Sequence, residues 1–260
     1  MGFIIQPCFA AYAYKKHERR AFLAVDAHLK THKARFICHT IINVAIIAII
    51  VCLYYLMGEN DAVNALNGSI IYRLDDQSRV GLECVVAWDS EYVNDILEIL
   101  DRENVRITFV VSGTWAKDNA DILQEMVKKG HEIATCAMNY SDTGSLGTVG
   151  LAESIEKSVK TIEALSNAEV KYYYCPVSDT AKAKRAAERA NIDCVRCTVD
   201  LLSARGDESL ITKRAGMSAK GAGIIAFTPT VSMTRALPDV IKVYKDASLF
   251  VTPVMYDSYN

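Results

Sequence analysis

A long apolar run near the N-terminus restricts this chain more than any other feature. Residues 36–57 read FICHTIINVAIIAIIVCLYYLM and contain no Asp, Glu, Lys or Arg. At ~1.5 Å per residue a helix over this run is about 33 Å long, close to the thickness of a bilayer's hydrocarbon core. A cleaved signal peptide would need a shorter basic region and a small-x-small site before Gly58. The run therefore predicts one transmembrane helix over 36–57, with the lipid bilayer as a partner; the alternative is a buried helix of a soluble protein.

Charge is distributed unevenly around this run. Lys and Arg outnumber Asp and Glu in residues 1–35, although the whole chain has a formal net charge of -2. Basic flanks stay inside by the positive-inside rule, so we expect a cytoplasmic tail over 1–35 and an exported C-terminal part, a single-pass cell-membrane protein. The tail is either a basic amphipathic helix on the lipid surface or disordered. The near-neutral balance indicates no nucleic-acid partner.

The exported part reads as a stem over 58–78 followed by one α/β domain over 79–260. Apolar, β-branched runs alternate with helical patterns. Strands are predicted at 80–86, 105–111, 132–137, 170–175, 193–198, 223–228 and 249–254. Helices are predicted at 90–103, 118–129, 151–165, 180–190, 208–217 and 237–245. Seven such strand–helix units predict parallel strands that close into a distorted (β/α)7 barrel, although an open doubly wound sheet fits the periodicity almost as well.

Five of the eight cysteines follow the membrane run, an odd number that leaves at least one thiol outside any intramolecular disulfide. Cys136 and Cys175 both end predicted strands, so we expect them near each other at one end of the barrel. Cys194 and Cys197 form a Cys-x-x-Cys motif inside a strand-like run. Side chains three apart on a strand face opposite sides, so two buried thiols are a better interpretation than a redox pair or a zinc knuckle.

The domain resembles the polysaccharide deacetylase (NodB homology) family. The segments VGLECVVAWDSEYVNDILEIL and ITFVVSGTWAKDNADILQEMVKKGHEI follow that family's first strand, first helix, ATFFV-like strand and Gly-His-Glu-Ile. The later elements follow in the same order, so the resemblance covers nearly all of the chain after Val80. It implies a distorted (β/α)7 barrel that acts on cell-wall or other N-acetylated glycans.

The resemblance also implies a metal-dependent site, and here this sequence departs from the family. The Asp pair of Thr-Phe-Asp-Asp-Gly falls on Val85 and Val86. The His-x-x-x-His pair falls on Cys136 and Tyr140, and the Arg of Arg-Pro-Pro-Tyr-Gly falls on Tyr174. The sequence therefore predicts no bound metal, no cofactor and no catalytic residue of the family's kind.

The last two motifs of the family are degenerate in the same way. Asp200 is kept from Asp-x-x-Asp-Trp, but Ser203 and Ala204 replace the other two residues. The late Leu-His falls on Phe227 and Thr228. A lone carboxylate such as Asp200 is more often a hydrogen-bonded support than a base.

Four further residues are candidates for a functional role: His131, Asp89, Tyr172 and Tyr174. His131 lies in the Gly-His-Glu-Ile motif, where the resemblance implies a structural residue. Asp89 follows the first strand and is expected to cap the next helix. Tyr172 and Tyr174 could bind a sugar together with Asp200, but alternation places Tyr173 on the opposite face of the strand.

Two functions remain open from the sequence. The first is a membrane-anchored pseudoenzyme that keeps the barrel and binds a cell-envelope glycan or an envelope protein. The second is an active carbohydrate N-deacetylase, or another hydrolase, with Cys136 as nucleophile or Asp200 as base. Cysteine catalysis needs a nearby His or a cation, and His131 is the one histidine after the membrane run.

Overall fold

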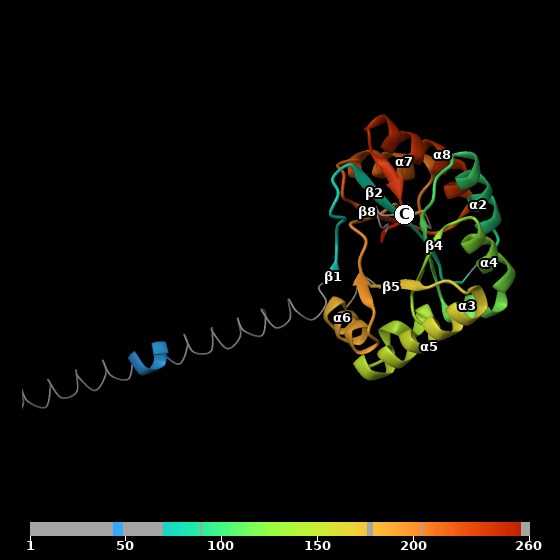
Figure 1. Ribbon diagram of the computed structural model, residues 1–260. Helices are drawn as coiled ribbons and strands as arrows, with labels where there is room; N and C mark the ends of the chain where they lie inside the picture. Colours follow the sequence, from blue (N-terminus) through green and yellow to red (C-terminus); the bar gives the residue numbers. More distant parts are fainter. Residues whose placement is uncertain (1–43, 49–69, 89, 176–178, 204, 256–260) are drawn as a thin grey trace, which may run out of the picture. The chain divides into compact units, whose positions relative to one another are not determined.

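The computed structural model describes residues 44–48, 70–88, 90–175, 179–203 and 205–255 (Figure 1). The chain forms two compact units, residues 1–64 and 65–260. In the first unit residues 44–48 are helical. The tail 1–35 and the rest of the predicted membrane segment 36–57 lie outside the described residues. Within the part that is described, no helix is both long and apolar enough to cross a membrane.

The second unit is built on one parallel sheet. Its described strands are β1 (Ile70–Ile71), β2 (Arg79–Val86), β3 (Thr108–Val111), β4 (Glu132–Thr135), β5 (Val170–Tyr174), β6 (Asp193–Val195), β7 (Val199–Asp200), β8 (Ile224–Phe227) and β9 (Phe250–Thr252). They lie in the order β1-β6-β5-β4-β3-β2-β8-β7, and β9 pairs with the start of β2. Every pair of these strands is parallel, so their C-terminal ends meet at one edge of the sheet.

Helices cover the outer face of the sheet (Figure 1). They are α2 (Val93–Arg102), α3 (Gly113–Asp118), α4 (Ala120–Lys128), α5 (Thr148–Ser166), α6 (Thr180–Arg189), α7 (Glu208–Ser218) and α8 (Val231–Asp246), with a 3-10 helix η1 (Tyr140–Gly144). Because parallel strands need crossover connections, these helices bury the sheet's outer side.

The alternation of side chains divides the core into layers. On β2, Leu82 and Cys84 point toward the helices, whereas Glu83 and Val85 point into the curled sheet. The interior layer also contains Cys136, Tyr172, Tyr174 and other buried side chains. Both faces of β2 are buried, but only the helix-facing side is apolar throughout; the interior side carries Glu83.

The expected α/β fold with parallel strands is confirmed, in the form of a curled half-barrel. Among the described residues no ladder joins the end strands β1 and β7. The described strands therefore do not form the closed barrel that the sequence predicted. Residues that follow β1 fill part of the gap: Arg73 forms an antiparallel bridge to Gly223, and Thr198 Oγ1 donates to the Tyr72 carbonyl over 2.7 Å.

Several elements differ from the expected ones. The predicted stem 58–78 contains β1, which adds parallel to β6, so the sheet begins before residue 79. Helix α3 was not expected; Ser112 begins it by accepting a hydrogen bond from the Trp115 N–H over 3.1 Å. Helix α8 begins at Val231, not 237, and carries Pro238 in its interior, where proline normally argues for a helix start.

Candidate functional site

The sequence-predicted positions gather at the C-terminal edge of the sheet, but they do not form a set of ligands. Val85 belongs to the interior layer with Cys136 and Tyr174. Val86, its neighbour, belongs to the layer between the sheet and the helices and is 1% exposed. Only one of the two valines therefore faces the interior, where the family's carboxylates would act.

The two positions of the histidine pair hold groups that stay protonated near neutral pH. Cys136, directly after β4, is fully buried, and burial raises the pKa of its thiol to about 12. Tyr140 is half-buried at the start of η1, and burial raises the pKa of its hydroxyl to about 12. Lys182 of α6 fixes this loop, because its Nζ donates to the carbonyls of Thr143, Gly144 and Leu146 over 2.9–3.1 Å.

Tyr174, Asp200 and Thr228 contribute to packing and to the structure of the loops. Tyr174 ends β5, is 6% exposed, and its hydroxyl lies 3.9 Å from Cys197 Sγ. Asp200 is exposed, and its Oδ1 accepts from the Leu202 N–H over 2.7 Å. The Thr228 N–H donates to Ser203 Oγ, and that hydroxyl donates back to the Thr228 carbonyl, both over 2.8 Å.

This donor set does not fit a catalytic metal. A catalytic zinc is held by three protein ligands, usually His, Asp, Glu or Cys thiolate. Val85 has no lone pair to offer, and Cys136 is a buried, protonated thiol. Within the described ranges, no group of three His, Cys, Asp or Glu side chains could hold a metal ion.

His131 does not lie beside Cys136, as a substitute cysteine mechanism would require of its base. His131 precedes β4, whereas Cys136 follows it, so the two lie at opposite ends of that strand. His131 is buried, its Nδ1 accepts from the Ile107 N–H over 3.3 Å, and its ring meets Phe109 edge to face at 5.0 Å. Burial lowers its pKa to about 4. His131 is therefore a neutral packing residue, as the sequence indicated.

The tyrosine run is largely inaccessible. Tyr172 and Tyr174 lie in the interior layer and Tyr173 lies on the helix side, so the predicted alternation is confirmed. Tyr172 and Tyr173 are 0% exposed. A sugar-stacking surface made by Tyr172 and Tyr174 is therefore contradicted by their burial. Asp89, the expected helix cap, lies outside the described residues, and α2 begins at Val93 instead of 90.

The cysteines also alternate between the interior and the helix side of the sheet. Cys175 comes one residue after the inward-facing Tyr174, so it lies on the helix side with Cys194, where Cys194 hydrogen-bonds it and lowers its pKa. Cys136 and Cys175 directly follow the paired strands β4 and β5, so both lie at the predicted end of the sheet, but Cys136 is in the interior layer and Cys175 on the helix side. Cys197 packs against the interior layer and Cys194 on the opposite side, as the spacing predicted.

Two residues were missed by the sequence reasoning, one inside the curled sheet and one at its C-terminal edge. Glu83 is 0% exposed, and its Oε2 accepts from the Tyr172 hydroxyl over 2.6 Å. Burial raises its pKa to about 7. Trp88, just past β2, is 65% exposed, and its ring meets Tyr140 edge to face at 5.1 Å. Counting in twos from Val85 would have placed Glu83 inside; nothing in the sequence alone marked Trp88 as exposed.

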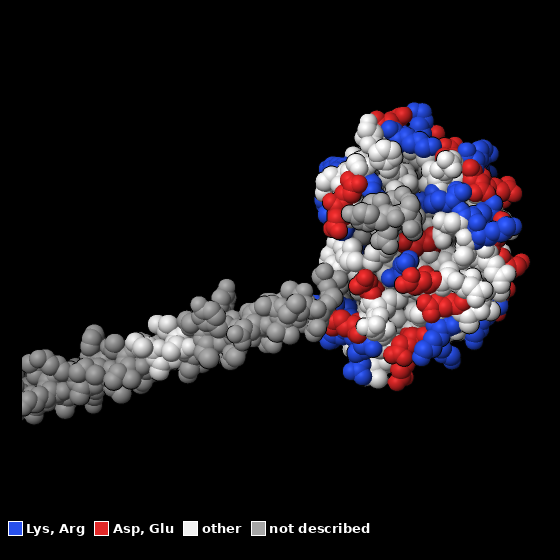
Figure 2. Space-filling model, viewed as in Figure 1, with Lys and Arg blue, Asp and Glu red and all other residues white. Residues whose placement is uncertain are grey.

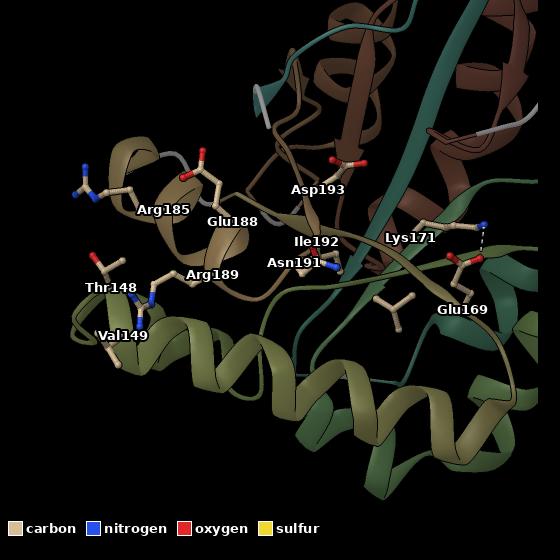
Figure 3. A pocket seen from close by; sticks show the side chains of 11 residues that line it. Thr148, Val149, Glu169, Lys171, Arg185, Glu188, Arg189, Asn191, Ile192 and Asp193 are labelled. Atoms are coloured by element: carbon tan, nitrogen blue, oxygen red, sulfur yellow. Dashed lines mark hydrogen bonds and ion pairs between the residues drawn. The ribbon is translucent and has the colours of Figure 1, made fainter. Parts of the chain in front are cut away.

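A groove lies near the N-terminal ends of β5 and β6, at the end of the strands opposite to Cys136 and Tyr174 (Figure 3). It has a volume of about 980 Å³ and is lined by the starts of β5 and β6, by α6 and by the start of α5. Its charges are mixed: Lys171 pairs with Glu169 over 2.7 Å, and Arg185 and Arg189 face the groove with Glu188. Basic and acidic side chains are also interspersed over the face in Figure 2. None of the positions on which the family's metal and catalytic motifs fall lines this groove.

Residues 69–195 match the polysaccharide deacetylase family. This match covers just under half of the chain and indicates a polysaccharide deacetylase-like domain. The domain is similar to an uncharacterized protein, YlxY, of Bacillus subtilis, with 28% identity over 174 residues, 66% of this chain and 54% of that protein. The chain therefore spans about half the length of that curated relative. It is also similar to a chitooligosaccharide deacetylase of Sinorhizobium fredii, with 28% identity over 86 residues, 33% of this chain and 40% of that enzyme.

Among solved structures, this polysaccharide deacetylase-like domain resembles a CE4 family pseudoenzyme from Bacillus anthracis. The TM-score is 0.67 at 26% identity, over 72% of this chain and 68% of that one. A mutant of the same protein, described as a pseudoenzyme with restored enzymatic activity, gives the same TM-score at 25% identity, over 72% of this chain and 70% of that one. The domain thus shares the curled fold of these proteins, and its residues 69–195 match the polysaccharide deacetylase family.

Proposed function

We propose that this chain is a membrane-anchored pseudoenzyme whose deacetylase-like domain lies outside the cytoplasm and binds an N-acetylated cell-envelope glycan without hydrolysing it. The observation that carries the proposal is the filled mouth of the half-barrel. Val85, Cys136 and Tyr174 pack there as one interior layer, each less than one tenth exposed.

The chemistry of amide hydrolysis supports the absence of catalysis. A metal-dependent deacetylase needs a metal to activate water and polarise the carbonyl, and a carboxylate to take the proton. Val85 supplies neither a ligand nor a base. The protonated thiol of Cys136 and the hydroxyl of Tyr140 are poor ligands near neutral pH.

The substitutes considered for an active hydrolase are also unfavourable. A nucleophilic Cys136 would have to lose its proton near neutral pH, and its pKa of about 12 opposes this. Asp200 is exposed, and its Oδ1 already accepts from the Leu202 N–H. We therefore favour binding over a substitute reaction.

The ligand class and the location come from relatives and from the sequence. The similarity to a chitooligosaccharide deacetylase supports an N-acetylated glycan as the ligand. The uncharged run 36–57 and the basic residues that precede it support one membrane anchor with the tail inside.

The test uses the full chain, purified in detergent and supplied with zinc. We expect saturable calorimetric binding of chitotetraose, a neutral oligomer of N-acetylglucosamine, with acetate release no faster than in a protein-free control. Chelator-sensitive release of acetate would contradict the pseudoenzyme. Absence of binding to both chitotetraose and soluble peptidoglycan fragments would contradict the glycan ligand.

A further inference from the structure

We propose that a small cavity beside Trp88 is a subsite for one uncharged pyranose ring of the bound glycan. The cavity has a volume of about 190 Å³ and lies between the end of β2, helix α3 and the start of η1. Pockets for drug-sized ligands measure roughly 300–1,000 Å³, so this one suits a single sugar ring. The inference rests on the proposed glycan binding and adds where the sugar sits.

Trp88 provides the apolar side of this subsite. It is 65% exposed, although tryptophan is usually well buried. The edge-to-face contact with Tyr140, at 5.1 Å and 77°, holds the ring while most of it remains in water. One face of a pyranose ring presents C–H groups, which pack well on such an aromatic surface.

The polar side consists of groups that are already held in place. The Asn139 Oδ1 accepts from the Thr114 hydroxyl, and its Nδ2 donates to Asp142 Oδ2 over 3.0 Å. The carboxylate of Asp118 also lines the cavity and is exposed. Such fixed groups bind sugar hydroxyls with little loss of side-chain entropy.

Trp115 is the second tryptophan of this cavity. It lines the same cavity and is 3% exposed, and its indole N–H is buried without an acceptor among the described residues. Buried donors are almost always satisfied in folded proteins. Satisfying this donor from the cavity would need a small movement of the wall, because the indole nitrogen itself is not accessible to water.

The charge of the lining selects the class of sugar. Among the described residues that line the cavity there is no Lys or Arg, and Asp118 is the one acidic side chain. An anionic sugar would meet a carboxylate without a compensating cation. The subsite therefore fits an uncharged ring such as N-acetylglucosamine.

The chain contains two tryptophans, and both line this cavity, so tryptophan fluorescence reports directly on its occupancy. The probe is chitotetraose, added to the full chain in detergent. We expect a saturable change in fluorescence, and a calorimetric dissociation constant that rises at least tenfold in Trp88→Ala and at least threefold in Asn139→Ala. The matched control is Phe250→Ala on β9, since Phe250 is 69% exposed but does not line the cavity.

The outcomes separate this inference from the function on which it rests. If the unmodified chain binds chitotetraose and Trp88→Ala binds equally well, the subsite is refuted while glycan binding stands. If the unmodified chain does not bind, both are refuted for this glycan. Because Trp88 is exposed, its substitution should leave the circular dichroism spectrum and unfolding midpoint close to those of the unmodified chain.

Discussion

The buried Glu83 gives a quantitative prediction about stability and pH. Its side chain is 0% exposed and has one hydrogen bond among the described residues, from the Tyr172 hydroxyl to Oε2. Burial, with smaller contributions from Glu132 and Asp200, raises the pKa of Glu83 from 4.5 to about 7, and the Tyr172 hydrogen bond opposes the rise. Replacing Glu83 with Gln removes this titration and keeps nearly the same shape.

The sign follows from which state binds the proton. Between pH 4.5 and 7 the folded domain keeps the Glu83 proton while the unfolded chain has lost it. The stabilising contribution is therefore fully present below pH 4.5 and is lost as the pH rises through 7. A difference of about 2.5 pH units, at ~1.4 kcal/mol per unit, corresponds to about 3 kcal/mol of unfolding free energy.

The titration of His131 changes the stability with pH in the opposite direction to that of Glu83. It would therefore mask the effect of Glu83 in the unmodified domain. Burial, followed by repulsion from Arg106, lowers its pKa from 6.5 to about 4. Its contribution is present above pH 6.5 and is lost as the pH falls toward 4. Between pH 4.5 and 6.5 the contributions of Glu83 and His131 change with pH in opposite senses. Only the difference between the Glu83→Gln variant and the unmodified domain isolates Glu83.

The assay is urea unfolding of residues 65–260, followed by circular dichroism from pH 4.5 to 8. We expect the unfolding free energy of Glu83→Gln, relative to the unmodified domain, to rise by about 3 kcal/mol across this range. The control is Glu98→Gln on the exposed face of α2. The difference in unfolding free energy between this variant and the unmodified domain should stay constant over the pH range. Parallel pH profiles for Glu83→Gln and the unmodified domain would refute the buried, protonated carboxyl.

Three further predictions concern the fold and the topology. Residues 65–260 should unfold cooperatively without residues 1–64, because the hydrophobic clusters lie within 70–255; a molten product in reducing buffer would contradict this. Tyr172→Phe should destabilise this unit by about 1–3 kcal/mol, and more at pH 8 than at pH 5, since Glu83 then loses its donor when charged; equal effects at both pH values would argue against that bond. A reporter fused after Asn260 should be active only outside the cytoplasm, and activity inside would reverse the proposed orientation.

The sequence predicts the order of elements well because most of them carry strong periodicity. All seven predicted strands overlap an observed strand. The elements it misses are short or depend on tertiary context. β1 contains two residues and forms only because β6 offers an open edge. The interior Pro238 of α8 is tolerated although local rules place it near a helix start.

The candidate site was predictable in part. The family motifs locate the replaced positions, and strand alternation predicts the opposite faces of Tyr172 and Tyr173. Along β2 the apolar Val80, Leu82 and Cys84 alternate with Arg79, Gly81 and Glu83, so counting in twos would also have placed Val85 and Val86 on opposite faces. The exposure of Trp88 depends on how the loops after β2 and β4 meet, which sequence periodicity does not report.

The most direct test of the central claim is the zinc content of the purified full chain after expression in zinc-supplemented medium and dialysis. We predict far less than one equivalent of zinc, because Val85, Cys136 and Tyr140 do not form a ligand set. A matched variant, Val85→Asp with Cys136→His and Tyr140→His, should retain more zinc; Val86 stays unchanged because it packs against the helices. Zinc well below one equivalent in the unmodified chain, with a gain in the variant, agrees with the account, whereas about one tightly held equivalent in the unmodified chain contradicts it.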